Sequence, residues 1–140
     1  MEKLETAKEK GICVDTDILV DFLRRREPGF SIYNKHKSSS YTMISSVTAF
    51  ELLFGGYLST KRDERLSEVN SMLEQHVILS FDSSSANQAA SIAADIQTSG
   101  KSIEIRDLFN AGICISADIP VLTRNKSHYE RVKGLKLITS

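Results

Sequence analysis

The sequence predicts an α/β fold in which helices cover both faces of a parallel sheet. Short apolar runs typical of buried strands alternate along the chain with segments whose apolar residues recur at helical spacing. The chain has 140 residues, of which 41% are hydrophobic, and this is enough for one packed core. We therefore expect a single domain over residues 11–140, preceded by a polar leader at residues 1–10.

Each strand is expected where a short apolar run is bounded by polar or turn-forming residues. In chain order these runs lie at 11–14, 41–44, 77–81 and 120–123, and a last apolar run at 135–138 closes the chain. Apolar runs of this length, bounded in this way, are typical of strands buried on both faces.

Each helix is expected from a start signal, an apolar stripe or a stop signal. In chain order the signals are Glu27-Pro28-Gly29 (end of the first helix), Ser45-Ser46 (start of the second), Gly55-Gly56 (its end), Asp82-Ser83 (start of the fourth), Gly100 (its end) and Asp107 (start of the fifth). The third helix is predicted from a stripe at Leu66, Val69 and Leu73, and a short helix is expected around Tyr129.

Charge and hydropathy exclude several classes of protein. Eighteen basic and eighteen acidic residues cancel, so no overall field draws the chain to DNA or to an anionic membrane. No apolar run approaches the roughly 20 residues of a membrane span, and the N-terminus alternates charges where a signal peptide would be apolar. We therefore expect a cytoplasmic protein. Cys13 and Cys114 lie inside apolar runs and are expected to be buried, reduced thiols.

Acidic and polar side chains gather where the strands end. Asp15 and Asp17 follow the first strand, Glu51 lies one to two turns into the helix after the second, and Asn125 follows the fourth. Asp107 opens the helix that leads into that fourth strand. Because ligands of open parallel sheets bind beyond the carboxyl ends of the strands, we expect these side chains to converge.

Each of these residues also has a purely structural interpretation. Asp15 and Asp107 could cap helices, and Asp17 could stabilise the fold without contacting a ligand. Glu51 could form a capping box with Thr48. Apolar residues flank Glu51, however, and this is a costly place for a carboxylate unless it faces a polar cleft.

The chemistry of such a cluster indicates a metal site. Carboxylates gathered without compensating Lys or Arg repel one another, and a hard divalent cation relieves that repulsion. Mg²⁺ and Mn²⁺ prefer oxygen ligands, polarise a phosphoryl oxygen and lower the pKa of an attacking water. The residues therefore favour metal-dependent hydrolysis of a phosphodiester.

Four segments of the chain resemble a known family. In chain order they are ICVDTDILVDFLRRRE, MISSVTAFELLFG, DSSSANQAASIAADIQTSG and IEIRDLFNAGICISADIPVLTRNKSHYERVKGLKL. Together they resemble the PIN-domain ribonucleases, above all the VapC-like toxins of toxin–antitoxin pairs. The resemblance implies a three-layer α/β/α sandwich with a mainly parallel central sheet. It also implies a homodimer, a small antitoxin partner and an endoribonuclease dependent on Mg²⁺ or Mn²⁺.

The resemblance also implies roles for particular residues. It assigns catalysis and metal binding to Asp15, Glu51 and Asp107. The fourth acidic position of the family falls on Asn125, where many members have Asp, so we expect one tightly held ion in the free protein. The remaining residues expected beside the metal or the substrate are Asp17, Thr16 and Thr123.

Other functions fit the sequence less well. A non-catalytic PIN-fold binding module is compatible with the loss of one acid. A haloacid-dehalogenase-type phosphatase would use the D-x-D of Asp15 and Asp17, but its late pair of acids is missing from 121–125. A response-regulator receiver would need a Lys on its last strand edge, usually before Pro, whereas Lys126 precedes Ser.

RNA would have to bind through local basic clusters, because the net charge is zero. The basic residues considered for this role are Arg24–Arg26, Lys35, Lys37, Lys61, Arg62, Lys101, Arg106, Arg124 and Lys126. A partner helix could dock on the apolar stripe of Phe50, Leu53, Phe54 and Leu58. The three histidines, His36, His76 and His128, are expected to be solvated surface residues.

Overall fold

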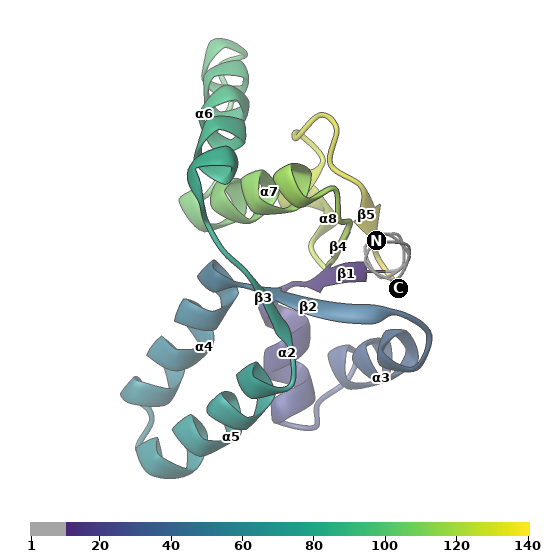
Figure 1. Ribbon diagram of the computed structural model, residues 1–140, viewed down its shortest axis with the longest axis vertical. Helices are drawn as coiled ribbons and strands as arrows, with labels where there is room; N and C mark the ends of the chain where they lie inside the picture. The colour runs from purple at the N-terminus through teal and green to yellow at the C-terminus, as the bar shows by residue number, and fades with distance from the viewer. Residues whose placement is uncertain (1–10) are drawn as a thin grey trace.

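The computed structural model describes residues 11–140 and confirms the α/β class (Figure 1). The predicted leader at residues 1–10 lies outside the described residues. Within residues 11–140, five parallel strands form one sheet in the order β3-β2-β1-β4-β5. The strands are β1 (Gly11–Val14), β2 (Tyr41–Ser45), β3 (Val77–Leu79), β4 (Val121–Leu122) and β5 (Leu137–Ile138). The central strand is therefore β1, which ends next to Asp15.

Helices cover both faces of this sheet. They are α2 (Thr16–Leu23), α3 (Gly29–Ser39), α4 (Ser46–Leu58), α5 (Arg62–Glu74), α6 (Ser83–Thr98), α7 (Ile105–Ala117) and α8 (Lys126–Tyr129). In Figure 1 the helices α2 to α5 lie below the sheet, whereas α6 and α7 lie above it. None of the helices in residues 11–140 has the length and apolar character needed to cross a membrane.

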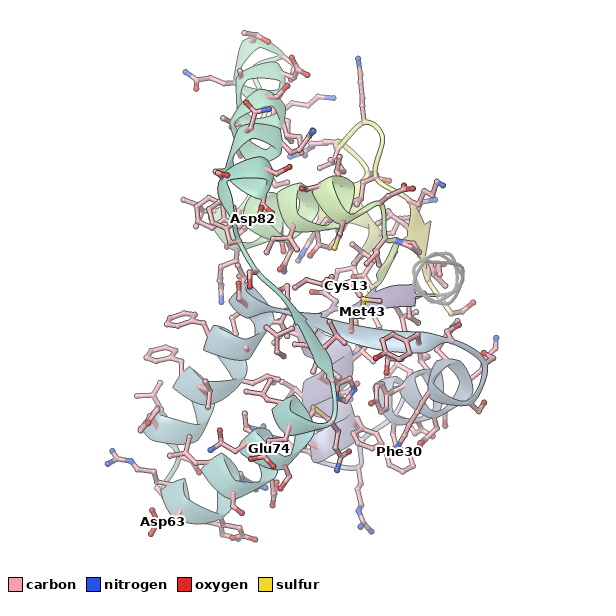
Figure 2. The ribbon with its side chains drawn as sticks, viewed as in Figure 1. Cys13, Phe30, Met43, Asp63, Glu74 and Asp82 are labelled. Carbon is pink, nitrogen blue, oxygen red and sulfur yellow. The ribbon has the colours of Figure 1, made fainter. Side chains whose placement is uncertain are left out.

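Alternate residues of β1 supply the two halves of the core. Ile12 and Val14 pack with buried side chains of α2 to α5, whereas Cys13 packs with those of α6 and α7. Cys13 lies in register with Met43 on the neighbouring strand (Figure 2). Both Cys13 and Cys114 are buried and free, as the apolar runs predicted. A three-layer α/β/α arrangement follows from this alternation.

Helix α3 is absent from the sequence prediction. Glu27-Pro28-Gly29 predicts only the end of a helix, but Pro28 also precedes the first residue of α3. Because Pro is favoured at the start of a helix, the same motif ends α2 and begins α3. Only Gly29 and Tyr33 of α3 are buried, so its apolar stripe is too weak to predict a helix from the sequence.

Most of the predicted helix boundaries are confirmed, but α4 continues past Gly55-Gly56 to Leu58, and α7 begins at Ile105, before Asp107. Ser45 accepts a hydrogen bond from the Thr48 amide at the start of α4, and Asp82 accepts one from the Ser85 amide at the start of α6. Gly100 has a φ of 75°, a left-handed conformation that suits the end of α6. The expectation for His76 is wrong, because its ring is held between the Tyr33 hydroxyl (2.7 Å) and the Met72 carbonyl (2.7 Å).

Candidate active site

A polar cleft of about 250 Å³ lies at the carboxyl edge of the sheet. The described residues that line it are Asp15, Thr16, Asp17, Glu51, Glu104, Arg106, Asp107, Asn125 and His128. Six of the seven residues predicted for the site are among them, and Thr123 is buried behind Asp15. The structure therefore brings together side chains separated by more than a hundred positions in the sequence.

Asp15 sits at the junction of β1 and α2 and is buried. One carboxylate oxygen accepts a hydrogen bond from the Thr16 amide (3.0 Å), and the other accepts one from the Thr123 hydroxyl (2.8 Å). Burial raises the pKa of Asp15 above its ordinary value, and the nearby charges of Asp17 and Asp107 raise it further. Asp15 thus caps α2 and also presents a carboxylate to the cleft, so its two interpretations are compatible.

Glu51 points into the cleft from α4. Its carboxylate accepts a hydrogen bond from the Thr16 hydroxyl (2.9 Å) and pairs with the Arg106 guanidinium (2.6 Å). The capping-box alternative with Thr48 is wrong, because Ser45 is the N-cap residue of α4. The expectation of a cluster without a compensating Arg is also wrong, since Arg106 neutralises Glu51 across the cleft.

Asp107 lies in the first turn of α7, whose N-cap residue is Glu104, so the interpretation of Asp107 as a helix cap is wrong. Burial raises the pKa of Asp107, and the neighbouring Glu104 and Glu51 charges act in the same direction. The His128 ring lies 3.4 Å from the Asp107 carboxylate and opposes that shift. His128 is exposed, as expected, and it also lines the cleft.

Asn125 and Asp17 face each other at the edge of the cleft. The Asn125 side-chain amide donates a hydrogen bond to the Asp17 carboxylate. The Asn125 backbone N–H donates to the Thr123 hydroxyl (3.0 Å), which itself donates to Asp15. Thr123 therefore uses its single hydroxyl both to orient Asp15 and to hold the segment that carries Asn125.

Sequence reasoning missed a buried polar network beneath the acids. The Tyr129 hydroxyl lies 3.4 Å from the Asp15 carboxylate, and its pKa is raised by burial and by the charges of Asp15 and Asp107. Asn110 in α7 is also buried and accepts a hydrogen bond from the Ser45 hydroxyl at 2.5 Å. Tyr129 follows Asn125 by one helical turn, so its place in the sequence also indicates a position near this edge of the sheet.

Arg124 has a different role from the one expected. It was considered a phosphate contact, but its guanidinium pairs with the buried carboxylate of Asp21 at 2.8 Å. The same Asp21 oxygen accepts a hydrogen bond from the Gly29 amide (3.0 Å). Arg124 therefore ties the segment that carries Thr123 and Asn125 to α2 and to the start of α3.

The donors in the cleft fit a hard divalent cation. Asp15, Glu51 and Asp107 offer carboxylate oxygens, which are the ligands that Mg²⁺ and Mn²⁺ prefer. Within residues 11–140, no three acidic, His or Cys side chains are close enough as they stand to hold an ion together. In the structure Glu51 is paired with Arg106, and Asp107 lies beside His128.

Comparison with known proteins agrees with this geometry. The model of the PIN domain family matches residues 12–135. The chain is 30% identical over 138 residues to ribonuclease VapC1 of Methanocaldococcus jannaschii, covering 97% of this chain and 92% of that protein. It is 26% identical over 123 residues to the tRNA(fMet)-specific endonuclease VapC of Shigella flexneri, covering 88% of this chain and 92% of that protein.

Solved structures show the same fold. VapBC2 from Rickettsia felis, bound to a DNA fragment from its promoter, matches with a TM-score of 0.82 at 20% identity, covering 91% of this chain and 97% of that one. VapBC-5 from Mycobacterium tuberculosis, a member of the VapBC family of toxin–antitoxin systems, matches with a TM-score of 0.70 at 20% identity. The match covers 94% of this chain and 99% of that one. At these identities the likeness concerns the fold alone.

Proposed function

The chain belongs to the PIN domain family, and on that premise we propose that it is a metal-dependent endoribonuclease, the toxin of a toxin–antitoxin pair. The observation that supports this most directly is the cleft that gathers Asp15, Glu51 and Asp107 at the carboxyl edge of the sheet. An RNA substrate also implies a cytoplasmic location.

Mg²⁺ or Mn²⁺ is the proposed cofactor. Asp15 and Asp107 would hold the ion, and Glu51 would complete the set once it leaves Arg106. Such an ion polarises the phosphoryl group and lowers the pKa of an attacking water. Burial raises the pKa of both Asp15 and Asp107, and the charge of Asp107 adds to the shift of Asp15. A cation bound between these carboxylates would offset the cost of burying their charges, which fits this role.

The other side chains of the cleft orient the acids. Thr123 holds Asp15 from behind, and the Thr16 hydroxyl holds Glu51 from the side. As a carboxylate, Glu51 is able to accept a proton from the attacking water. Asn125 lies at the edge of the cleft with Asp17, where its amide can donate a hydrogen bond to a phosphate oxygen.

Partners are proposed on separate grounds. A small antitoxin is expected because VapC relatives of this chain and VapBC complexes share its family or fold. The outer face of α4 offers an apolar surface made of Phe50, Phe54, Tyr57 and Leu58, all of which are exposed. Leu53, predicted for the same stripe, packs instead against the core. The homodimer remains a prediction from the resemblance.

The decisive experiment combines RNA cleavage with metal binding. Single-stranded RNA incubated with the protein and Mn²⁺ should be cut, and a chelator should abolish cleavage. Mn²⁺ at 100 times its dissociation constant should stabilise the fold by about 2.7 kcal/mol. Both effects should be lost in Asp107→Asn, with cleavage falling roughly a hundredfold or more.

The matched control for this variant is Asp118→Asn. Asp118 lies exposed at the other end of α7, in a left-handed conformation that Asn tolerates well. It should therefore behave like the wild type. Cleavage that persists in chelator would refute metal dependence, and metal binding without any cleavage would favour the non-catalytic binding module.

A further inference from the structure

The ion pair between Arg106 and Glu51 spans the mouth of the cleft. Arg106 Nη1 lies 2.6 Å from the Glu51 carboxylate, and its Nη2 lies 3.7 Å from the carboxylate of Glu104. Arg106 also directly precedes Asp107 in α7. Its guanidinium is therefore anchored beside one proposed metal ligand and bonded to another.

The charge balance of the cleft makes this pair important. Among the described lining residues, Arg106 is the single Lys or Arg, whereas five carry carboxylates. With His128 neutral, the lining thus has a formal charge of −4. An RNA phosphate approaching this surface meets one fixed positive charge, and that charge is engaged by Glu51.

The exposure of the pair allows it to exchange partners. The Arg106 side chain is 54% exposed, whereas that of Glu51 is 17% exposed. Ion pairs open to solvent on one side contribute little to stability, so breaking this one costs little. A guanidinium also binds a phosphate with two parallel hydrogen bonds, a geometry that Lys lacks.

We propose that Arg106 is a substrate-binding residue that moves from Glu51 to an RNA phosphate. This inference rests on the proposed ribonuclease function. In the resting cleft Arg106 neutralises Glu51 and so competes with a divalent cation for that carboxylate. When RNA enters, the phosphate takes the guanidinium and Glu51 is released toward the metal. Arg106 thus opposes metal binding in the free protein and favours RNA binding.

Arg106→Gln tests both effects, because they have opposite signs. Removing one positive charge near the site should tighten the binding of Mn²⁺ alone by roughly fivefold, as measured by calorimetric titration. The same change should raise KM for a single-stranded RNA. It should also lower the slope of log KM against log salt by about 0.7, the value for one phosphate contact on a single strand.

Two further variants separate substrate binding from a structural role. Arg106→Lys keeps the charge and should restore the salt slope while leaving KM partly raised. Arg131→Gln removes an exposed guanidinium that donates to the Ser102 carbonyl (2.5 Å) and does not line the cleft, and it should change neither quantity. If Arg106 only tied α7 to α4, Arg106→Gln would lower the melting temperature and leave the salt slope unchanged.

The outcomes distinguish this inference from the proposed function. An Mn²⁺ affinity or a salt slope equal to that of the wild type in Arg106→Gln would overturn the role of Arg106, even if the wild type cleaves RNA normally. If the wild type does not cleave RNA, the proposed function fails. In that case, the binding of a labelled single-stranded RNA in Ca²⁺, followed by fluorescence anisotropy, tests Arg106 without turnover: unweakened binding in Arg106→Gln would refute its contact with phosphate.

Discussion

Replacing Thr123 by Val probes the hydrogen bond that holds the central acid of the site. The Thr123 hydroxyl donates a hydrogen bond to the Asp15 carboxylate at 2.8 Å and accepts one from the backbone N–H of Asn125 at 3.0 Å. Val has nearly the same shape but no hydroxyl, so the substitution removes both bonds without leaving a cavity. Thr123 is fully buried, at 0% exposure, and water cannot easily take the place of the lost hydroxyl.

The expected loss of stability follows from these two bonds. A hydrogen bond to a charged group contributes about 1.5–3 kcal/mol and a neutral one about 1 kcal/mol, so Thr123→Val should lose roughly 2–4 kcal/mol. At about 3 °C per kcal/mol for a chain of this size, the melting temperature should fall by roughly 6–12 °C. The pKa of Asp15 should also rise further, because Thr123 is the strongest of its contacts that lower it.

The functional consequence concerns metal affinity. Groups that orient a metal ligand typically contribute 10–100-fold to affinity, so Mn²⁺ should bind Thr123→Val about that much more weakly. Calorimetric titration measures this affinity, and thermal unfolding in chelator measures stability. Thr123→Ser keeps the hydroxyl, so it should recover most of the Mn²⁺ affinity and most of the thermal stability.

A second control is Thr98→Val, which removes an exposed hydroxyl that donates to the Asp95 carbonyl at the end of α6. It should alter neither measurement by much. If Thr123→Val matched the wild type in both stability and Mn²⁺ affinity, the hydrogen bond to Asp15 would have no role in orienting the site.

Two further predictions concern Asn125 and Asp82. Asn125→Asp places a second carboxylate against Asp17, so it should lower the stability of the metal-free protein. It should also tighten Mn²⁺ binding by about tenfold or add a second bound ion, and calorimetric titration measures both the affinity and the number of ions. An unchanged affinity and ion count would place Asn125 outside the site. At the start of α6, hydrogen bonds from Ser85 lower the pKa of Asp82, so the folded state favours its carboxylate. This stabilisation is present above the ordinary pKa of 3.8 and is lost as the pH falls through the lowered value. Asp82→Ala should therefore be less stable than the wild type at neutral pH and equally stable in strong acid, as measured by chemical denaturation. A loss of stability in Asp82→Ala that is the same at all pH values would contradict this. The control is Asp95→Ala, because Asp95 is exposed on the same helix.

The positions of the first four strands and of the acids along the chain were predictable because local signals specify them. The buried run Gly11–Val14 followed by Asp15 indicates a strand that ends in a polar site, and the apolar neighbours of Glu51 indicate a carboxylate facing a cleft. Ser45 and Asp82 were recognisable as caps because a cap bonds to the backbone within three residues. Helix α3 was not predicted because most of its side chains are exposed, so it has no clear apolar stripe.

The partners of the charged residues could not be predicted in this way. Arg106 and Arg124 look alike in the sequence, since both stand beside residues of the site. The structure bonds the first to Glu51 in the cleft and the second to the buried Asp21. Each pair joins residues more than fifty positions apart, so no local pattern distinguishes them.

The sequence by itself determined the α/β class, the carboxyl edge at which chemistry is expected, and the acids Asp15, Glu51 and Asp107 that meet there. Only the tertiary structure decided that Thr123 orients Asp15, that Tyr129 lies beneath it, and that Arg106 neutralises Glu51. The physical reason is that periodicity and capping are local properties of the backbone, whereas hydrogen bonds and ion pairs in a cleft depend on how the packed layers bring distant side chains together.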